Sequence, residues 1–288
     1  MSKKEVGEIS GTRTTGHEWD GIKELDTPMP RWWVWLYLAT IVWAAGYWVV
    51  MPSWPLVSSY THGIFNYSQR DKVAADLVAL KTARASNEQA LATASLPQIQ
   101  GDPALQQFAM AEGKAAFGDN CAPCHGSGGQ GARGYPNLND DVWLWGGSLN
   151  DIQHTITVGV RSTAGDTRNS QMPAFGRDAM LKPEQIDDLT EYVVRLSRRP
   201  ADLRAVKRAT QLFADNCAAC HGPDGKGNRQ YGAPNLTDNE WLYGAARENI
   251  HDQIWNGHGG VMPTWGGRLS PETIKSLAVY VHSLGGGE

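Results

Sequence analysis

The sequence has few cysteines and no excess of basic residues. Only four cysteines occur in 288 residues, and they form two close pairs, unlike the scattered spacing of a disulfide framework. Lys and Arg number 26 against 30 Asp and Glu, so the formal net charge is −4. Binding to nucleic-acid phosphates needs a basic excess, and the charge balance therefore argues against nucleic acid as a partner.

Charged side chains are missing altogether from residues 32–51. As a helix, this stretch would be about 30 Å long, which matches the hydrocarbon core of a bilayer. Tryptophans crowd both of its ends, as expected at the two membrane interfaces. A cleaved signal peptide has a shorter apolar region, and a soluble core helix would show a polar face. We predict a transmembrane helix over 32–52, ended by Pro52.

Basic residues near this helix favour one orientation. Arg13, Lys23 and Arg31 precede it, whereas Arg70 is the only basic residue in the twenty that follow. The positive-inside rule then places the polar tail 1–31 in the cytoplasm and the rest of the chain on the other side of the membrane.

The next segment, 53–103, is predicted to be a helix followed by a linker. Apolar residues recur at helical spacing from 68 to about 91, without glycine or proline. Residues 92–103 contain Pro97, Gly101 and Pro103 and are typical of a linker.

The rest of the chain is an internal repeat. The same motifs occur in the same order in both halves, and each half closes with an amphipathic helix that has a proline at its start. The paired motifs are Cys-Ala-Pro-Cys-His at 121–125 and Cys-Ala-Ala-Cys-His at 217–221, Pro-Asn-Leu at 136–138 and 234–236, Trp-Leu at 143–144 and 241–242, and Met-Pro at 172–173 and 262–263. We predict two tandem copies of one mostly α domain, over 104–200 and 201–288.

A Cys-x-x-Cys-His motif is typical of covalent c-type haem attachment. The two thiols can reach the two vinyl groups at one edge of the porphyrin, and the adjacent histidine can turn its imidazole under the iron. The predicted residues are Cys121, Cys124 and His125 for the first haem, and Cys217, Cys220 and His221 for the second. Haem is attached to such motifs outside the bacterial cytoplasm, which agrees with the predicted orientation.

A methionine thioether is the expected second axial ligand in cytochromes c, where it raises the reduction potential. Met172 is predicted to serve the first haem and Met262 the second, since each lies in a Met-Pro loop at the matching place in its repeat. His258 is near enough to Met262 in the sequence to be its rival. Side chains that could pack on haem or bond its propionates are Tyr135, Trp143, Tyr231, Trp241 and Arg161.

Two other interpretations of the cysteine pairs are weaker. A zinc site would need two further ligands per site in a compact pattern, and none is visible. A thioredoxin-like pair would lie in alternating strands and helices, which the sequence does not show.

Taken together, these motifs resemble class I cytochrome c domains and the dihaem membrane subunit (subunit III, CcoP/FixP type) of cbb3-type cytochrome c oxidases. The specific part of the resemblance is His-Glu-Trp-Asp-Gly-Ile at 17–22, Glu-Leu at 24–25 and Pro-Met-Pro-Arg-Trp-Trp at 28–33, with Ser-Gln-Met-Pro-Ala-Phe-Gly at 170–176. Some members of that family have two membrane helices, whereas only one span is visible here.

The resemblance implies an electron-transfer subunit of an oxygen-reducing oxidase in the bacterial inner membrane. It implies two covalent haem c groups and three protein partners, namely a catalytic subunit with haem b and copper, a monohaem membrane cytochrome c, and a soluble donor cytochrome c. The chain would relay electrons without being catalytic alone. The alternatives are a dihaem subunit of a periplasmic dehydrogenase, and a peroxidase or gas sensor, which would need an iron with a displaceable ligand.

Overall fold

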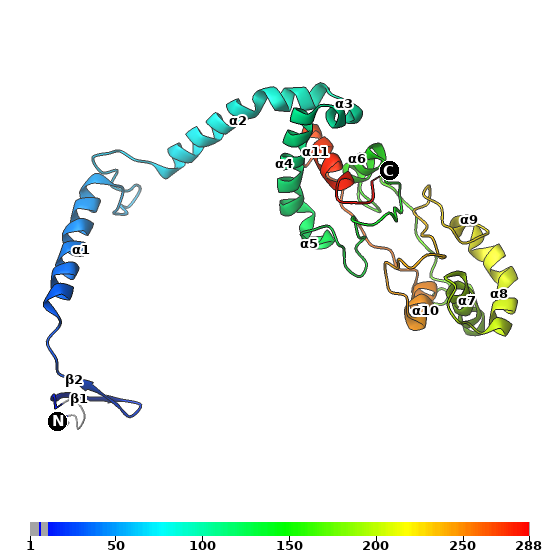
Figure 1. The fold of residues 1–288 in the computed structure, drawn as a ribbon, viewed down its shortest axis with the longest axis horizontal. Coiled ribbons are helices and arrows are strands. Elements are labelled where there is room, and N and C mark those ends of the chain that lie inside the picture. The colour runs from blue at the N-terminus through cyan, green and yellow to red at the C-terminus, as the bar shows by residue number, and fades with distance from the viewer. Residues whose placement is uncertain (1–5, 7–10, 288) are drawn as a thin grey trace. The chain divides into compact units, whose positions relative to one another are not determined.

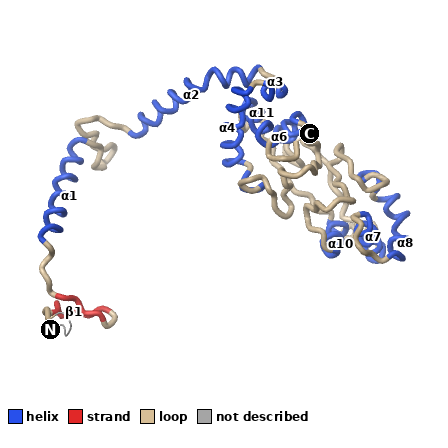
Figure 2. The backbone as a smooth tube through the Cα atoms, in the orientation of Figure 1, coloured by secondary structure: helices blue, strands red, loops and turns tan. Residues whose placement is uncertain are grey.

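The computed structural model describes residue 6 and residues 11–287. Contacts divide the chain into an N-terminal part, up to Ala83, and a C-terminal part, from Arg84. Within the described residues, helices dominate both parts, and the strands β1 and β2 lie close to the N terminus (Figures 1 and 2).

The N-terminal part begins with an antiparallel hairpin of β1 (Thr14–Trp19) and β2 (Ile22–Leu25). Between the strands, Asp20 and Gly21 have positive φ values of 50° and 84°. Both central residues of a type I′ turn need this conformation, and Asp-Gly is a favoured pair for it. The hairpin adds structure to a stretch from which we predicted only a polar tail.

Helix α1 (Arg31–Val50) lies where the transmembrane helix was predicted, within two residues at each end. None of its side chains is buried. Among the described helices, only α1 is long and apolar enough to cross a bilayer. The helix is consistent with a single-pass membrane protein.

Helix α2 (Gln69–Thr93) confirms the helix predicted after the membrane span. The predicted linker is wrong, because most of it forms α3 (Leu96–Gly101) and the start of α4 (Pro103–Asn120). The carboxylate of Asp102 caps α4 by accepting two backbone N–H bonds at 2.9 and 3.1 Å. The prolines occupy first turns, where a missing N–H costs nothing, so here they start helices and do not break them.

The remaining helices follow the two repeats. They are α5 (Ala122–His125), α6 (Leu149–Val158), α7 (Pro183–Leu196), α8 (Leu203–Asn216), α9 (Ala218–His221), α10 (Arg247–Asn256) and α11 (Pro271–His282). The closing helices α7 and α11 confirm the predicted amphipathic helices, including their starting prolines.

These helices form two bodies, each around its own core. The first body contains α3, α4, α5, α6 and α11, and the second contains α7, α8, α9 and α10 (Figure 1). The ring of Phe117 packs 5.4 Å from that of Tyr280 in the first body, and Phe213 packs 4.8 Å from Tyr192 in the second. In both bodies, a Phe–Tyr pair therefore joins a closing helix to the helix that leads into the Cys-x-x-Cys-His motif. We call α4 and α8 the motif-bearing helices.

The closing helices are exchanged between the repeats. Helix α11 ends the second repeat but packs on α4 and α6 of the first, while α7 ends the first repeat and packs on α8 and α10 of the second. Gly113 of α4 lies so close to the Ser276 carbonyl of α11 that a Cβ there would overlap it. Sequence repeats and folded bodies therefore do not coincide.

The exchange takes place where two chain segments run past each other. Val160 and Met262 form an antiparallel bridge, in which each backbone N–H donates to the other carbonyl at 3.0 Å. Gly159, after α6, lies against the Met262 carbonyl, and Gly257, after α10, lies against that of Met172. Both glycines have positive φ, 72° and 61°, so these close approaches suit glycine alone.

Candidate functional site

Each Cys-x-x-Cys-His motif forms a short helix that begins just after its first cysteine: α5 in the first repeat and α9 in the second. The N–H groups of Cys121 and Cys217 donate to Phe117 and Phe213 of the preceding helices at 2.8 and 2.9 Å. In each motif the first cysteine is partly buried and the second is exposed. The thiols therefore lie along the edge of a body, as attachment to the edge of a flat ring requires.

The motif histidines are held by carbonyls of the Pro-Asn-Leu motifs. Nδ1 of His125 lies 3.0 Å from the Pro136 oxygen, and Nδ1 of His221 lies 3.1 Å from that of Pro234. A carbonyl only accepts, so Nδ1 carries the proton and Nε2 remains available to a metal. Burial lowers the pKa of both imidazoles, which favours the neutral form that binds metal.

Burial raises the pKa of the Cys121 and Cys217 thiols to about 11, and the neighbouring cysteine of each pair adds to the effect. At neutral pH the unattached groups are therefore protonated thiols. Among the described residues, no group of three or more His, Cys, Asp or Glu side chains could hold a metal ion. The sites therefore do not favour the zinc interpretation.

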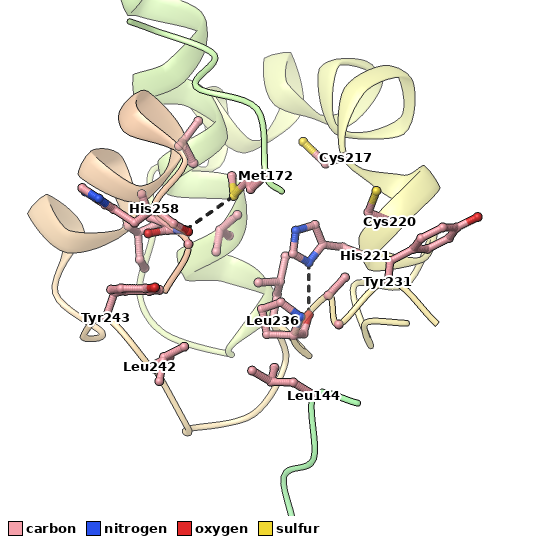
Figure 3. Close-up of a pocket in the computed structure, with 18 of the residues that line it drawn as sticks. Leu144, Met172, Cys217, Cys220, His221, Tyr231, Leu236, Leu242, Tyr243 and His258 are labelled. Carbon is pink, nitrogen blue, oxygen red and sulfur yellow. Dashed lines mark hydrogen bonds between the residues drawn. The ribbon is translucent and has the colours of Figure 1, made fainter. Parts of the chain in front are cut away.

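Each body contains one of the two Met-Pro methionines. Met172, His221, Cys217 and Cys220 line one cavity in the second body (Figure 3). In the first body, Met262 packs on the same core as Cys121.

This pairing differs from the one predicted from the order of the repeats, in which Met172 shared a site with His125, and Met262 with His221. The structure brings Met172 to His221, and Met262 to the core that carries Cys121. The reason is the exchange of closing helices. Each Met-Pro loop directly precedes α7 or α11, so it is carried into the other body together with that helix.

One polar side chain, that of Gln253, lies near the sulfur of Met172. The Gln253 side-chain nitrogen lies 3.8 Å from the sulfur and donates to the His258 carbonyl at 2.9 Å. His258, the rival ligand considered above, lines this cavity, but its Nε2 lies 2.7 Å from an Asp252 carboxylate oxygen. Met172 therefore offers the cavity a soft donor, while the ring of His258 is paired with an acid.

The donor set and the lining fit a haem. The cavity places an imidazole, a thioether and two thiols around a space whose other walls are mostly apolar, which suits a flat apolar ring with an iron at its centre. The apolar lining includes Phe175, Leu189, Val193, Phe213, Leu236 and Ile254.

Three of the predicted haem-packing residues line the cavity of the second body, which we call the second cavity. They are Tyr231, Trp241 and Arg161. Trp143 packs on the core of the first body, and Tyr135 is largely exposed. Sequence reasoning missed Leu144 and Trp145, which reach the second cavity from the first repeat, and Gln253. Leu144 belongs to the repeated Trp-Leu motif, but the motif does not show that it reaches the site of the other repeat, and Gln253 on α10 has no counterpart in the repeated motifs.

Three family models match the chain. "N-terminal domain of cytochrome oxidase-cbb3, FixP" covers residues 11–58, "Cytochrome c" covers 110–197, and "Cytochrome C oxidase, cbb3-type, subunit III" covers 204–281. The chain thus has one apolar N-terminal helix followed by two cytochrome c domains, which confirms the predicted fold class.

Whole-chain relatives agree with these models. The chain is 56% identical to the cbb3-type cytochrome c oxidase subunit FixP of Bradyrhizobium sp., over 99% of this chain and 98% of the relative. It is 52% identical to FixP of Rhizobium meliloti, over 99% and 98% of the two chains. It is 49% identical to the subunit CcoP of Cereibacter sphaeroides, over 96% and 95%.

Proposed function

The chain belongs to the family of cbb3-type cytochrome c oxidase subunits FixP and CcoP, an electron-transfer cytochrome subunit of that oxidase, and we propose that it relays electrons through two c-type haems with crossed axial ligands. The observation that carries this proposal is the shared cavity of Met172 and His221. Electrons would enter from a soluble donor cytochrome c and leave toward the subunit that reduces oxygen.

The proposed ligand sets combine residues of both repeats. Cys121 and Cys124 attach the first haem, with His125 and Met262 on its iron; for the second haem the residues are Cys217, Cys220, His221 and Met172. The matched aromatic pairs and glycine contacts of the two bodies support equivalent sites. When bound, a haem supplies an iron that accepts or gives up one electron.

The protein's contribution is to fill both axial positions and to keep the surroundings apolar. The Pro136 and Pro234 carbonyls fix the orientation of the two imidazoles, which limits reorganisation when charge changes. With a histidine and a methionine on the iron, no position is left for a substrate, so transfer is outer-sphere. This arrangement disfavours the peroxidase and gas-sensor alternatives, and membership of the oxidase family replaces the dehydrogenase alternative.

We infer that α1 anchors the chain in the bacterial inner membrane, with the N terminus in the cytoplasm and both haem bodies in the periplasm. The basic residues before α1 and their scarcity after it support this orientation. The proposed partners are the catalytic haem b and copper subunit and the monohaem membrane cytochrome c.

The test is to purify the tagged chain gently from its native membranes and to measure haem c, haem b and copper. We expect all three together, with two haem c groups attached to this chain and a third to the monohaem partner, and oxygen uptake that cyanide inhibits. In rapid mixing with a reduced donor cytochrome, haem c should be reduced before haem b. Haem c alone, with neither haem b nor copper, would contradict the relay role.

A further inference from the structure

Arg161 joins the two methionine loops at the point where they cross. Its Nε donates to the Gly260 carbonyl at 2.6 Å, and its Nη1 donates to the Ser170 carbonyl at 2.7 Å. Gly260 lies two residues before Met262, and Ser170 lies two residues before Met172. One guanidinium therefore holds equivalent positions of both loops.

The backbone around Arg161 is shaped for this contact. Arg161 has a φ of 50°, which a non-glycine residue rarely adopts. Its N–H donates to the Arg168 carbonyl at 2.8 Å, and the preceding residue, Val160, forms the backbone bridge with Met262. The partly buried guanidinium bonds two neutral carbonyls, so its planar donors act as a fixed spacer.

We propose that Arg161 is a positioning residue that couples axial ligation at the two haems, because it sets the distance between the loops that present Met172 and Met262. The inference rests on the crossed ligation proposed above. Arg161 also lines the second cavity, and a residue that only bonded the propionate of that haem would affect the second haem alone. The hydrogen bonds of Arg161 to both methionine loops, in contrast, predict that both haems change together.

The experiment compares the intact oxidase with Arg161→Gln and Arg161→Lys, with Arg177→Gln as the matched control. Arg177 follows the Met172 loop, but its side chain is exposed and pairs with Asp178. Imidazole is titrated into the oxidised protein while the sulfur-to-iron charge-transfer band in the far red is recorded. Each haem of this chain that loses its methionine removes its own share of the band, while the contribution of the monohaem partner stays the same in all variants.

With Arg161→Gln, we expect both haems to bind imidazole about tenfold more tightly, since each loop loses a hydrogen bond from a charged donor. Arg161→Lys keeps the positive charge but loses the planar guanidinium that bonds both loops. It should give a smaller change in imidazole affinity at both haems. A change at one haem only, or at neither, would overturn the coupling. Absence of the band from the unmodified protein would instead refute the proposed methionine ligation.

A separate observation concerns the segment 53–67, which folds back on the end of α1. Backbone N–H groups of Ile64 and Phe65 donate to the Val49 and Val50 carbonyls at 3.0 Å. The Ser53 hydroxyl lies 3.3 Å from the Trp48 carbonyl and 2.8 Å from that of Met51. The last carbonyls of α1 therefore have partners without water, as a helix end in a low-dielectric environment requires.

The large apolar side chains of this segment are exposed, namely Trp54, Leu56, Val57, Tyr60, Ile64, Phe65 and Tyr67. Ile64 and Phe65 are 72% and 68% exposed at the level of the last turn of α1. From residue 32 to residue 69 the chain has no Asp, Glu, Lys or Arg. We infer that 53–67 is a collar that lies in the interfacial layer of the lipid bilayer and fixes the depth of α1. The inference rests on the proposed membrane span.

The collar is tested with a nitroxide label on Phe65→Cys in the oxidase reconstituted into phospholipid vesicles, where the haem cysteines are already bonded. Val42→Cys on α1 and Lys81→Cys on α2 are the lipid and water controls. We expect collisions with oxygen at position 65, as at 42, and few with a water-soluble nickel chelate. Nickel accessibility like that of position 81 would overturn the collar, as would shielding from both probes, which would indicate a protein contact. Nickel accessibility at 42 itself would refute the membrane span.

Discussion

Leu277→Ala should destabilise the first body, although Leu277 belongs to the second repeat. Its side chain is fully buried in the core that α11 shares with α4. Truncating a buried leucine costs about 2–5 kcal/mol, from lost transfer free energy and the cavity left behind. The matched control is Leu189→Ala in α7, since Leu189 is 1% exposed and belongs to the first repeat but packs in the second body.

The assay is limited proteolysis of the haem-loaded protein in native conditions, with the haem peptides identified by mass. The cost corresponds to a population of opened body roughly thirty- to several-thousand-fold larger, and cleavage follows that population when opening is fast. Leu277→Ala should release the peptide with Cys121 and Cys124, and Leu189→Ala the peptide with Cys217 and Cys220. The exchange would be refuted if each variant first released the haem peptide of its own repeat.

Three further results are expected. In a chain with Cys121→Ala and Cys124→Ala, Met172→Ala should abolish the thioether-to-iron band of the remaining haem, while Met262→Ala should leave it; the opposite result would restore the pairing by sequence order. Gly113→Ala should lower the denaturation midpoint of the first body, although alanine is favoured over glycine in helices by about 1 kcal/mol, because the added Cβ overlaps the Ser276 carbonyl; a raised midpoint would contradict this packing. Hydrogen bonding to Arg247 holds the pKa of the Glu191 carboxyl below its usual 4.5, so this ion pair stabilises the second body above that pH and is lost as pH falls through the lowered pKa. Glu191→Gln should therefore reduce stability at neutral pH by less than about 1 kcal/mol and leave it unchanged in acid, as measured by denaturant titration at both pH values.

Local pattern was enough to predict the closing helices, and it is also the basis of the haem-ligand assignments, which stay predictions. Each depends on neighbours in the sequence, such as the three-residue spacing of Cys121 and Cys124 or the proline that starts α11. The hairpin was also within reach, since Asp20-Gly21 is a strong turn signal. The linker prediction is wrong because it treats Pro97 and Pro103 as helix breakers. Ser95 and Asp102 precede these prolines as helix caps, and this local signal marks two helix starts.

The pairing of the sites could not be predicted from the sequence, because the repeat itself makes it ambiguous. Phe117 meets Tyr280 as Phe213 meets Tyr192, so either closing helix offers an aromatic partner to either motif-bearing helix. The choice depends on the connections after Gly159 and Gly257, where the backbone bridge between Val160 and Met262 forms. A bridge between residues about a hundred positions apart leaves no periodic trace in the sequence.

The exchange also fixes the order in which the sites can be completed. The first motif, at 121–125, is made early, but its methionine and the helix that closes its core lie in the last thirty residues of the chain. The first body therefore stays open until α11 has been made, while the second body can close once residue 257 is in place. A substitution in the core of α7 or α11 should therefore act first on the body that carries the Cys-x-x-Cys-His motif of the other repeat.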